Sequence, residues 1–158
     1  MTAVRTIDKI IQSGILNRDL SEIPKNGADF TQLAELDNGL PRAISKMHKQ
    51  ILVAWDGLNL EIIRIYGAGL SVASVKRLIE SQRYAVTEDM IVFADDPAGF
   101  IFMEGGDGSV YSLDSKTSNF ERIAFNLEEF FADKVFGKDA EEFMGDYWFG
   151  RLKDFNLV

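Results

Sequence analysis

The sequence predicts a single α+β domain in which a mixed, largely antiparallel sheet, a β-meander, is flanked by N- and C-terminal helices. The length of 158 residues fits one domain. Near both ends of the chain, apolar residues recur every three or four positions, which is the helical period. Between residues 90 and 125, four short runs of aromatic and branched residues alternate with turn formers, which is typical of strands joined by tight turns.

The N-terminal part is predicted to be helical. Apolar residues at helical spacing indicate a helix over 2–13, which Gly14 ends. After a connector, Asp29 and Gln32 have the spacing of a capping box, so a second short helix is expected over 29–36.

The middle of the chain predicts two further helices and a strand. Pro41 suits the first turn of a helix, because its missing N–H costs nothing there. Residues 61–66 are expected to form a strand, and 72–82 a helix with Ser71 as its N-cap. The apolar stripe of the helix that begins at Pro41 consists of Leu40, Ile44, Met47, Ile51 and Trp55.

The meander is predicted from the spacing of its strands. The runs begin about ten residues apart with short loops between them, which requires antiparallel neighbours. Residues 100–103 are apolar at every position, so we expect that strand to be central and covered on both faces. The four predicted strands are 90–94, 99–103, 109–113 and 120–125.

Helices are also predicted to close the chain. Asn126 and Glu129 form an N-cap pair for a helix that Gly137 ends. Asp139 with Glu142 indicates one more short helix before an apolar tail that docks on the core. The expected organisation is an N-terminal helix and connector (1–28), the α+β domain (29–137) and a C-terminal helical tail (138–158).

The composition excludes several kinds of chemistry. The chain has no cysteine, so it has no disulfide, thiolate nucleophile or cysteine metal site. Its single histidine, His48, cannot build a multi-histidine metal site, and it lies beside the apolar stripe, where a structural histidine is expected. We find no signal peptide and no apolar run long enough to span a bilayer, so a cytoplasmic location is expected.

Two patterns allow a chemical reading beside a structural one. Gly67-Ala68-Gly69 between a predicted strand and helix resembles a dinucleotide-binding turn, but the third glycine and further βαβ units are missing. Carboxylates in the hairpin loops can bind Ca²⁺ or Mg²⁺ or act as an acid/base pair. Asp and Gly are also common in turns, because Asp hydrogen-bonds to nearby backbone and Gly adopts positive φ angles. We therefore prefer the interpretation that these residues form turns.

Charge is unevenly distributed. Residues 95–147 contain 13 acidic and 4 basic side chains, whereas residues 1–94 are balanced. An acidic field repels nucleic acid and attracts a basic protein partner, although an acidic face can also serve solubility alone. The residues expected to contact the partner are the hairpin carboxylates Asp95, Asp96, Glu104, Asp107 and Asp114.

The order of elements resembles the SUKH superfamily over residues 30–137. The fragments that carry the resemblance are Leu40-Pro41 with the helix to Trp55; Phe93, Asp95, Asp96, Gly99 and Phe102; Asp107, Gly108, Val110 and Tyr111; and Ile123, Ala124, Phe125, Glu128, Glu129 and Phe130. The resemblance implies a largely antiparallel sheet flanked by helices and no enzyme activity. Many members of that superfamily are immunity proteins that neutralise a toxin domain, often a nuclease, and others are regulatory interaction modules.

The expected function is therefore non-catalytic protein binding. The first hypothesis is an immunity protein that neutralises a basic toxin domain such as a nuclease. The alternative is a general regulatory or scaffolding interaction module. No cofactor, metal, nucleic acid or membrane is expected, and the sequence leaves the oligomeric state open.

Overall fold

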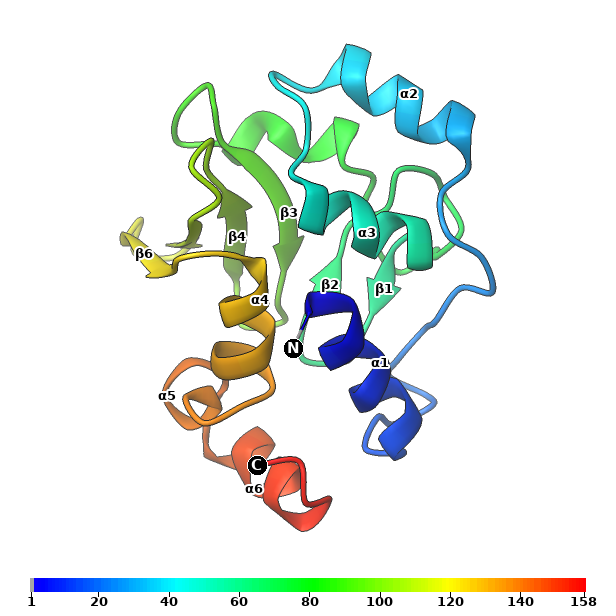
Figure 1. The fold of residues 1–158 in the computed structure, drawn as a ribbon. Helices are drawn as coiled ribbons and strands as arrows, with labels where there is room; N and C mark the ends of the chain where they lie inside the picture. Colours follow the sequence, from blue (N-terminus) through cyan, green and yellow to red (C-terminus); the bar gives the residue numbers. More distant parts are fainter. Residues whose placement is uncertain (1) are drawn as a thin grey trace.

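The centre of the fold is one six-stranded sheet in which every strand pairs antiparallel with the next strand along the chain. The computed structural model describes residues 2–158 (Figure 1). The meander predicted from the sequence is confirmed. Its strands are β1 (Leu58–Asn59), β2 (Arg64–Ile65), β3 (Ile91–Asp95), β4 (Phe100–Glu104), β5 (Val110–Asp114) and β6 (Phe120–Ala124).

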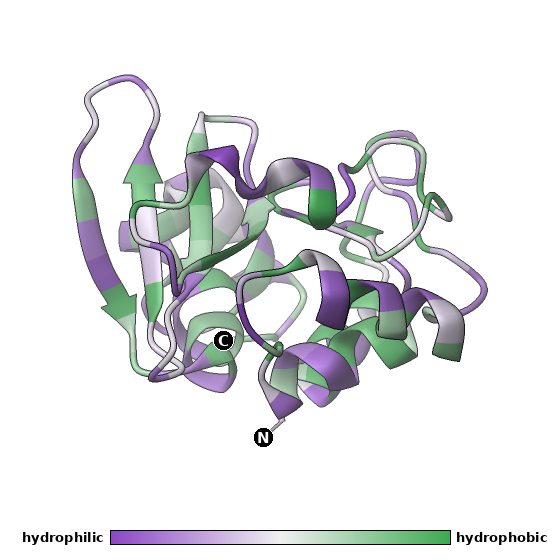
Figure 2. Cartoon of the chain, turned by 90° about the horizontal axis from the view of Figure 1, so that it is seen from above, coloured by the Kyte–Doolittle hydropathy of each residue, from purple (hydrophilic) through white to green (hydrophobic). Residues whose placement is uncertain are grey.

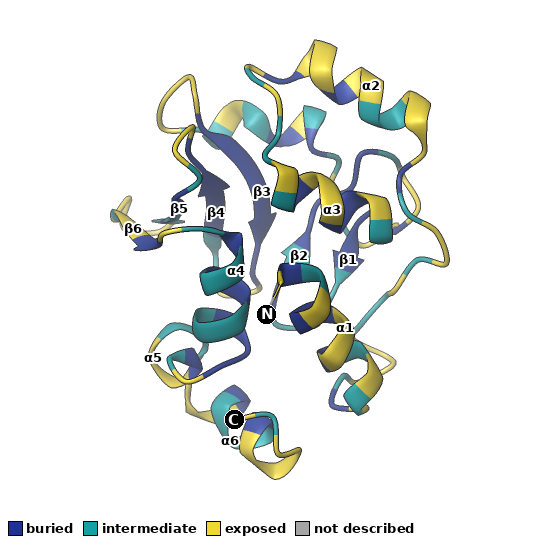
Figure 3. Ribbon diagram, in the orientation of Figure 1, coloured by how far each residue is buried: buried dark blue, intermediate teal, exposed yellow. Residues whose placement is uncertain are grey.

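The last four strands agree with the prediction because local turn formers set their limits. Gly99 and Gly108 both have positive φ angles, of 98° and 87°, in the β3–β4 and β4–β5 turns. As expected for a central strand, β4 is almost wholly buried (Figure 3). The edge strand β6 has hydrophobic ends and a hydrophilic stretch between them (Figure 2). In the sequence, this hydrophilic stretch is Glu121 and Arg122.

The first part of the sheet differs from the prediction, because β1 was not expected and β2 is shorter than expected. Residues 61–66 were expected to be one strand, but β2 contains only Arg64 and Ile65. Glu61 instead lies in the tight turn after β1, with a φ of 70°. Its backbone N–H donates to Asn59 Oδ1, which supports this uncommon conformation.

Three helices precede the sheet: α1 (Ala3–Ser13), α2 (Phe30–Gly39) and α3 (Lys46–Ala54). Gly14, with a φ of 81°, ends α1 as predicted. The capping box of Asp29 and Gln32 is present at the start of α2, with both hydrogen bonds formed.

Two helical predictions are wrong in the middle of the chain. Pro41 lies outside α3, which begins five residues later at Lys46 with Ser45 as its N-cap. Residues 72–82 are mostly irregular, and only the 3₁₀ turn η1 (Ile79–Tyr84) is helical. Ser71 does not cap a helix, because its hydroxyl donates to the buried carboxylate of Asp56.

The C-terminal helices are α4 (Leu127–Glu129), the π-helical turn η2 (Phe130–Val135), α5 (Ala140–Met144) and α6 (Asp146–Asp154). Asn126 caps α4 through the N–H of Glu129, as expected. Asp139 precedes α5 without a capping hydrogen bond, and it pairs with Lys134 at 3.0 Å.

Helices α1, α3 and α4 lie on the same side of the sheet, and α6 extends the fold away from it (Figure 1). The core between these layers is aromatic: the ring centroids of Phe102 and Phe130 are 5.1 Å apart. Trp148 of α6 is buried, and its indole N–H donates to Val135 O at 2.8 Å. The tail therefore docks on the core, and α1 packs against α3 and η2 of the same chain.

Candidate protein-binding surface

The predicted contact residues Asp95, Asp96, Glu104, Asp107 and Asp114 do not form one face. Pairing of Asp95 with Ile101 and of Phe100 with Asp114 places Asp95, Asp96 and Asp114 at one end of the strands. Glu104, which pairs with Val110, lies at the other end with Asp107. Three of the five carboxylates are also buried.

Asp95 is an internal ion-pair residue. It is 2.6 Å from Arg64 Nε and accepts a hydrogen bond from the Tyr66 hydroxyl at 2.8 Å. Lys76 Nζ lies 3.7 Å away. Burial, together with the adjacent Asp95 carboxylate, raises the pKa of Tyr66, which keeps the phenol protonated as a donor. Asp95 thus joins β2, β3 and the segment after β2.

Asp96 and Glu104 are buried at opposite ends of β4. Asp96 Oδ1 accepts from the N–H groups of Ala98 and Phe100, which holds the β3–β4 turn. Glu104 Oε2 accepts from the Ser45 hydroxyl at 2.8 Å and so anchors the N-terminus of α3. Burial raises the pKa of both carboxyls. The structure therefore gives these two residues internal roles and takes them out of the exposed face that we expected.

Asp107 lies in the β4–β5 turn and Asp114 is the last residue of β5, and both are accessible. The Ser109 N–H donates to Asp107, and the Lys116 N–H donates to Asp114, both at 2.9 Å. These hydrogen bonds lower the pKa of each carboxyl, so both are charged at neutral pH. Within residues 2–158, no three potential ligands gather in a way that could hold a metal ion.

A denser acidic surface lies over β6 and the C-terminal helices. Residues 120–146 contain eight carboxylates and three basic side chains. Lys134 pairs with Asp139, Lys138 lies 3.9 Å from Asp133, and Arg122 lies over the ring of Phe125. Among the described residues, the remaining carboxylates form no ion pair: Glu121, Glu128, Glu129, Glu141, Glu142 and Asp146.

Two of these carboxylates border an apolar groove of about 160 Å³, which we call the acidic groove. Glu121 comes from β6 and Glu142 from α5, and both are exposed. Ser112 adds a polar group, and the apolar lining is Phe100, Phe102, Ile123, Phe130, Phe143 and Met144. The sequence signal for this site is the net negative charge of residues 95–147. The charge does not show which carboxylates are buried, and for this reason the prediction placed the contact residues in the hairpin loops.

The glycine-rich turn is filled by a carboxylate of the chain itself. Asp56 is buried, and its oxygens accept from the Gly69 N–H at 2.9 Å and from the Ser71 hydroxyl at 2.6 Å. A Cβ on Gly69 would lie 2.8 Å from Asp56 Oδ2. The N–H group that a phosphate would need is therefore already used.

His48 is buried in the core, as expected for a structural histidine. Its ring meets Phe93 edge-on at 5.9 Å between centroids. Neither ring nitrogen has a hydrogen-bond partner among residues 2–158. Burial, with a smaller effect of Arg42, lowers the pKa of His48 to about 4, so the ring is neutral at physiological pH.

A scan of protein families finds none that matches this chain, and a search of curated proteins finds no match. The resemblance to the SUKH superfamily therefore stays a prediction from the sequence pattern. Among the described residues, none of the helices combines the length and the apolar character that a bilayer crossing requires.

Proposed function

We propose that this chain is a non-catalytic protein-binding domain, an immunity protein that neutralises a basic toxin domain such as a nuclease. The observation that supports the proposal best is the acidic groove, in which Glu121 and Glu142 flank an apolar floor without partners of their own. Apolar contact supplies affinity at such a surface, and unpaired charge supplies orientation and a fast association rate.

A nuclease presents cations to the phosphates of its substrate, and those cations are the complement of this surface. Two of the six unpaired carboxylates of residues 120–146 line the groove, and each of the other four is within two residues of a lining residue in the sequence. An acidic domain that covers such an active site blocks substrate binding without any chemistry of its own. The association is expected to weaken as salt rises, because exposed charges are screened beyond about 8–10 Å at physiological salt.

The test uses tagged wild-type protein to capture partners from the cells that produce it. The variant Glu121→Lys/Glu142→Lys changes the groove, and Asp8→Lys/Glu35→Lys is the matched control, because it makes the same charge change at exposed positions on α1 and α2. The wild type and the control should retain a basic protein that salt releases. The groove variant should lose it.

Whether the chain protects cells from the captured protein distinguishes an immunity protein from a regulatory or scaffolding module. Cells that express the captured protein should survive with the wild type or the control and die with the groove variant. If the captured protein is harmless and its retention is insensitive to salt, the chain is a regulatory or scaffolding module instead. Single Asp107→Lys and Asp114→Lys variants show whether the two exposed hairpin carboxylates contribute.

A further inference from the structure

We propose that a second surface, the groove between α1 and α3, binds an acidic amphipathic helix of a partner protein. This groove is distinct from the acidic groove in position and in charge. The proposal does not depend on the immunity function, since it rests on a different set of residues. It would give the chain two surfaces of opposite charge.

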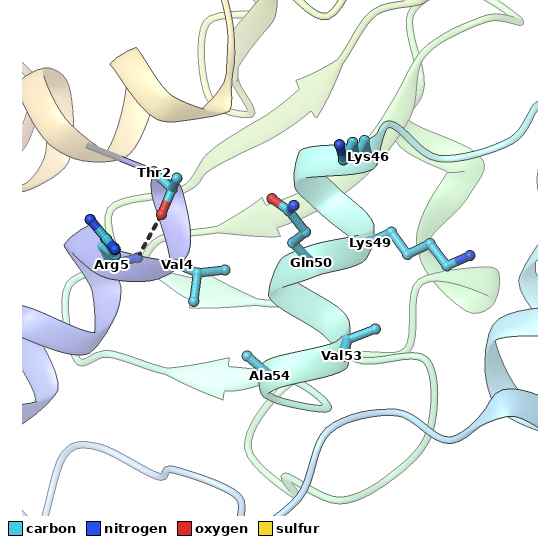
Figure 4. A pocket seen from close by; sticks show the side chains of 8 residues that line it. All are labelled: Thr2, Val4, Arg5, Lys46, Lys49, Gln50, Val53 and Ala54. Atoms are coloured by element: carbon cyan, nitrogen blue, oxygen red, sulfur yellow. Dashed lines mark hydrogen bonds between the residues drawn. The ribbon is translucent and has the colours of Figure 1, made fainter.

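The groove between α1 and α3 has an apolar floor open to solvent. It encloses about 590 Å³, and Val4 of α1 points toward α3 across it (Figure 4). Gln50 points toward α1 from the opposite wall. Val53 remains 54% exposed, which is high for a branched apolar side chain in a folded domain. Burial of this floor by a partner would remove apolar surface from water, the main source of binding free energy.

Cations line the rim of this groove. Arg5 comes from α1, and Lys46 and Lys49 come from α3. Among residues 2–158, none of the three forms an ion pair or donates a side-chain hydrogen bond. No carboxylate lines the groove, and Asp8, one turn along α1 from Arg5, lies outside it. The charge that complements this rim is negative.

The shape of the groove favours a helix as the occupant. One wall is the whole of α3, whose nine residues are about 14 Å long at 1.5 Å per residue, and the other is the N-cap and first turn of α1, with Thr2, Val4 and Arg5. A third helix can pack in the groove between two such walls, with its apolar residues at i, i+3 and i+4 on the floor. Acidic residues on the flanks of that helix would then reach Arg5 on one side and Lys46 and Lys49 on the other.

The experiment is a selection of phage-displayed helical peptides of about 12 residues on the full-length chain. Enriched peptides should carry a net negative charge and an apolar stripe at helical spacing. One enriched peptide is then synthesised with a fluorophore, and its Kd is measured by anisotropy. Lys46→Glu/Lys49→Glu should weaken binding by about tenfold or more, because attraction becomes repulsion at two positions.

Two controls isolate the groove. Lys116→Glu/Lys153→Glu makes the same charge change in the β5–β6 turn and on α6, and it should leave the Kd within about twofold. Glu121→Lys/Glu142→Lys should not weaken the peptide, so failure of the acidic groove and failure of this surface are distinguishable. Circular dichroism verifies that each variant is folded.

Three results would overturn the proposal. The first is the absence of enrichment, or enrichment of neutral or basic peptides. The second is a dimer, seen by sedimentation, that Lys46→Glu/Lys49→Glu dissociates, because a second copy would then cover the groove. The third is binding to phosphatidylserine vesicles that is lost in this variant, because the cations would then serve a membrane.

Discussion

Arg151 of α6 and Glu61 of the β1–β2 turn form an ion pair between residues that are 90 positions apart, with 2.7 Å between Nη1 and Oε1. Glu61 also accepts from the Asn17 N–H at 3.1 Å, and Arg151 donates to Ile15 O. The side chains of Arg151 and Glu61 are only 19% and 14% exposed. The pair thus joins the N-terminal connector, the sheet and the C-terminal tail at one point.

We expect Arg151→Met to lower the free energy of unfolding by about 2–3 kcal/mol, because it leaves a largely buried carboxylate without its partner. Urea unfolding monitored by tryptophan fluorescence measures this loss. The double variant Arg151→Met/Glu61→Gln should lose less than the sum of the two single variants. Additive losses would show that the two side chains are not coupled.

The same pair should make stability sensitive to acid. Burial alone would raise the pKa of Glu61, but the hydrogen bonds and charge of Arg151 and the Asn17 N–H outweigh burial and lower it below the ordinary 4.5. A carboxyl with a lowered pKa in the folded state stabilises above its unfolded-state pKa, and this contribution is lost as pH falls through the folded value. The difference in stability between wild type and Arg151→Met should therefore shrink below pH 4.5.

His48 predicts a second, separate dependence on pH. Its pKa falls from 6.5 to about 4 on folding. Between these two pH values, His48 is therefore protonated in the unfolded chain and neutral in the folded chain. Stability should decline by about 3 kcal/mol as pH falls from 6.5 toward 4. His48→Leu removes both unpartnered ring nitrogens and this titration with them, so the stability of the wild type minus that of the variant should fall by about 3 kcal/mol over this range. A difference that stays constant with pH would contradict the neutral buried ring.

The sequence predicted the elements whose limits are set by nearby residues. Asn126 and Glu129, or the glycines of the hairpins, act within a few positions, so their effect can be recognised in a short window. The errors at Pro41 and Ser71 have a tertiary origin. Ser45 caps α3 while it also binds Glu104, 59 residues away, and Ser71 donates to Asp56, 15 residues away. No local pattern contains these partners.

The candidate site was less predictable than the fold. The excess of acidic residues in 95–147 is visible in the sequence, but burial separates Glu104 from Glu121 only in the folded chain. The pairing of Arg64 with Asp95 and the docking of α5 beside β6 decide which carboxylates reach solvent. The net charge of the segment therefore predicted an acidic surface. Where that surface lies depends on how the strands and helices pack, which the sequence pattern does not show.

Asp56 should be required for the conformation of the glycine-rich turn. Asp56→Ala leaves the Gly69 N–H and the Ser71 hydroxyl without an acceptor, and we expect a loss of about 2–3 kcal/mol in urea unfolding. Amide hydrogen exchange localises the effect, because the Gly69 amide should lose protection in this variant. Ser71→Ala is the milder control and should cost about 1 kcal/mol. Equal stability of Asp56→Ala and wild type would contradict the role of this carboxylate.

Two glycines in the C-terminal helical region should respond oppositely to the same substitution. A Cβ on Gly137 would lie 1.8 Å from Ala132 O, so Gly137→Ala forces the backbone after η2 to move and should cost more than about 2 kcal/mol. Gly150 lies within α6, and a Cβ there meets nothing within 4 Å. Gly150→Ala should therefore raise the free energy of unfolding by about 0.5–1 kcal/mol, because alanine loses less backbone entropy in a helix. Urea unfolding of both variants beside the wild type gives the comparison, and a stable Gly137→Ala would show that η2 does not pack so closely against residue 137.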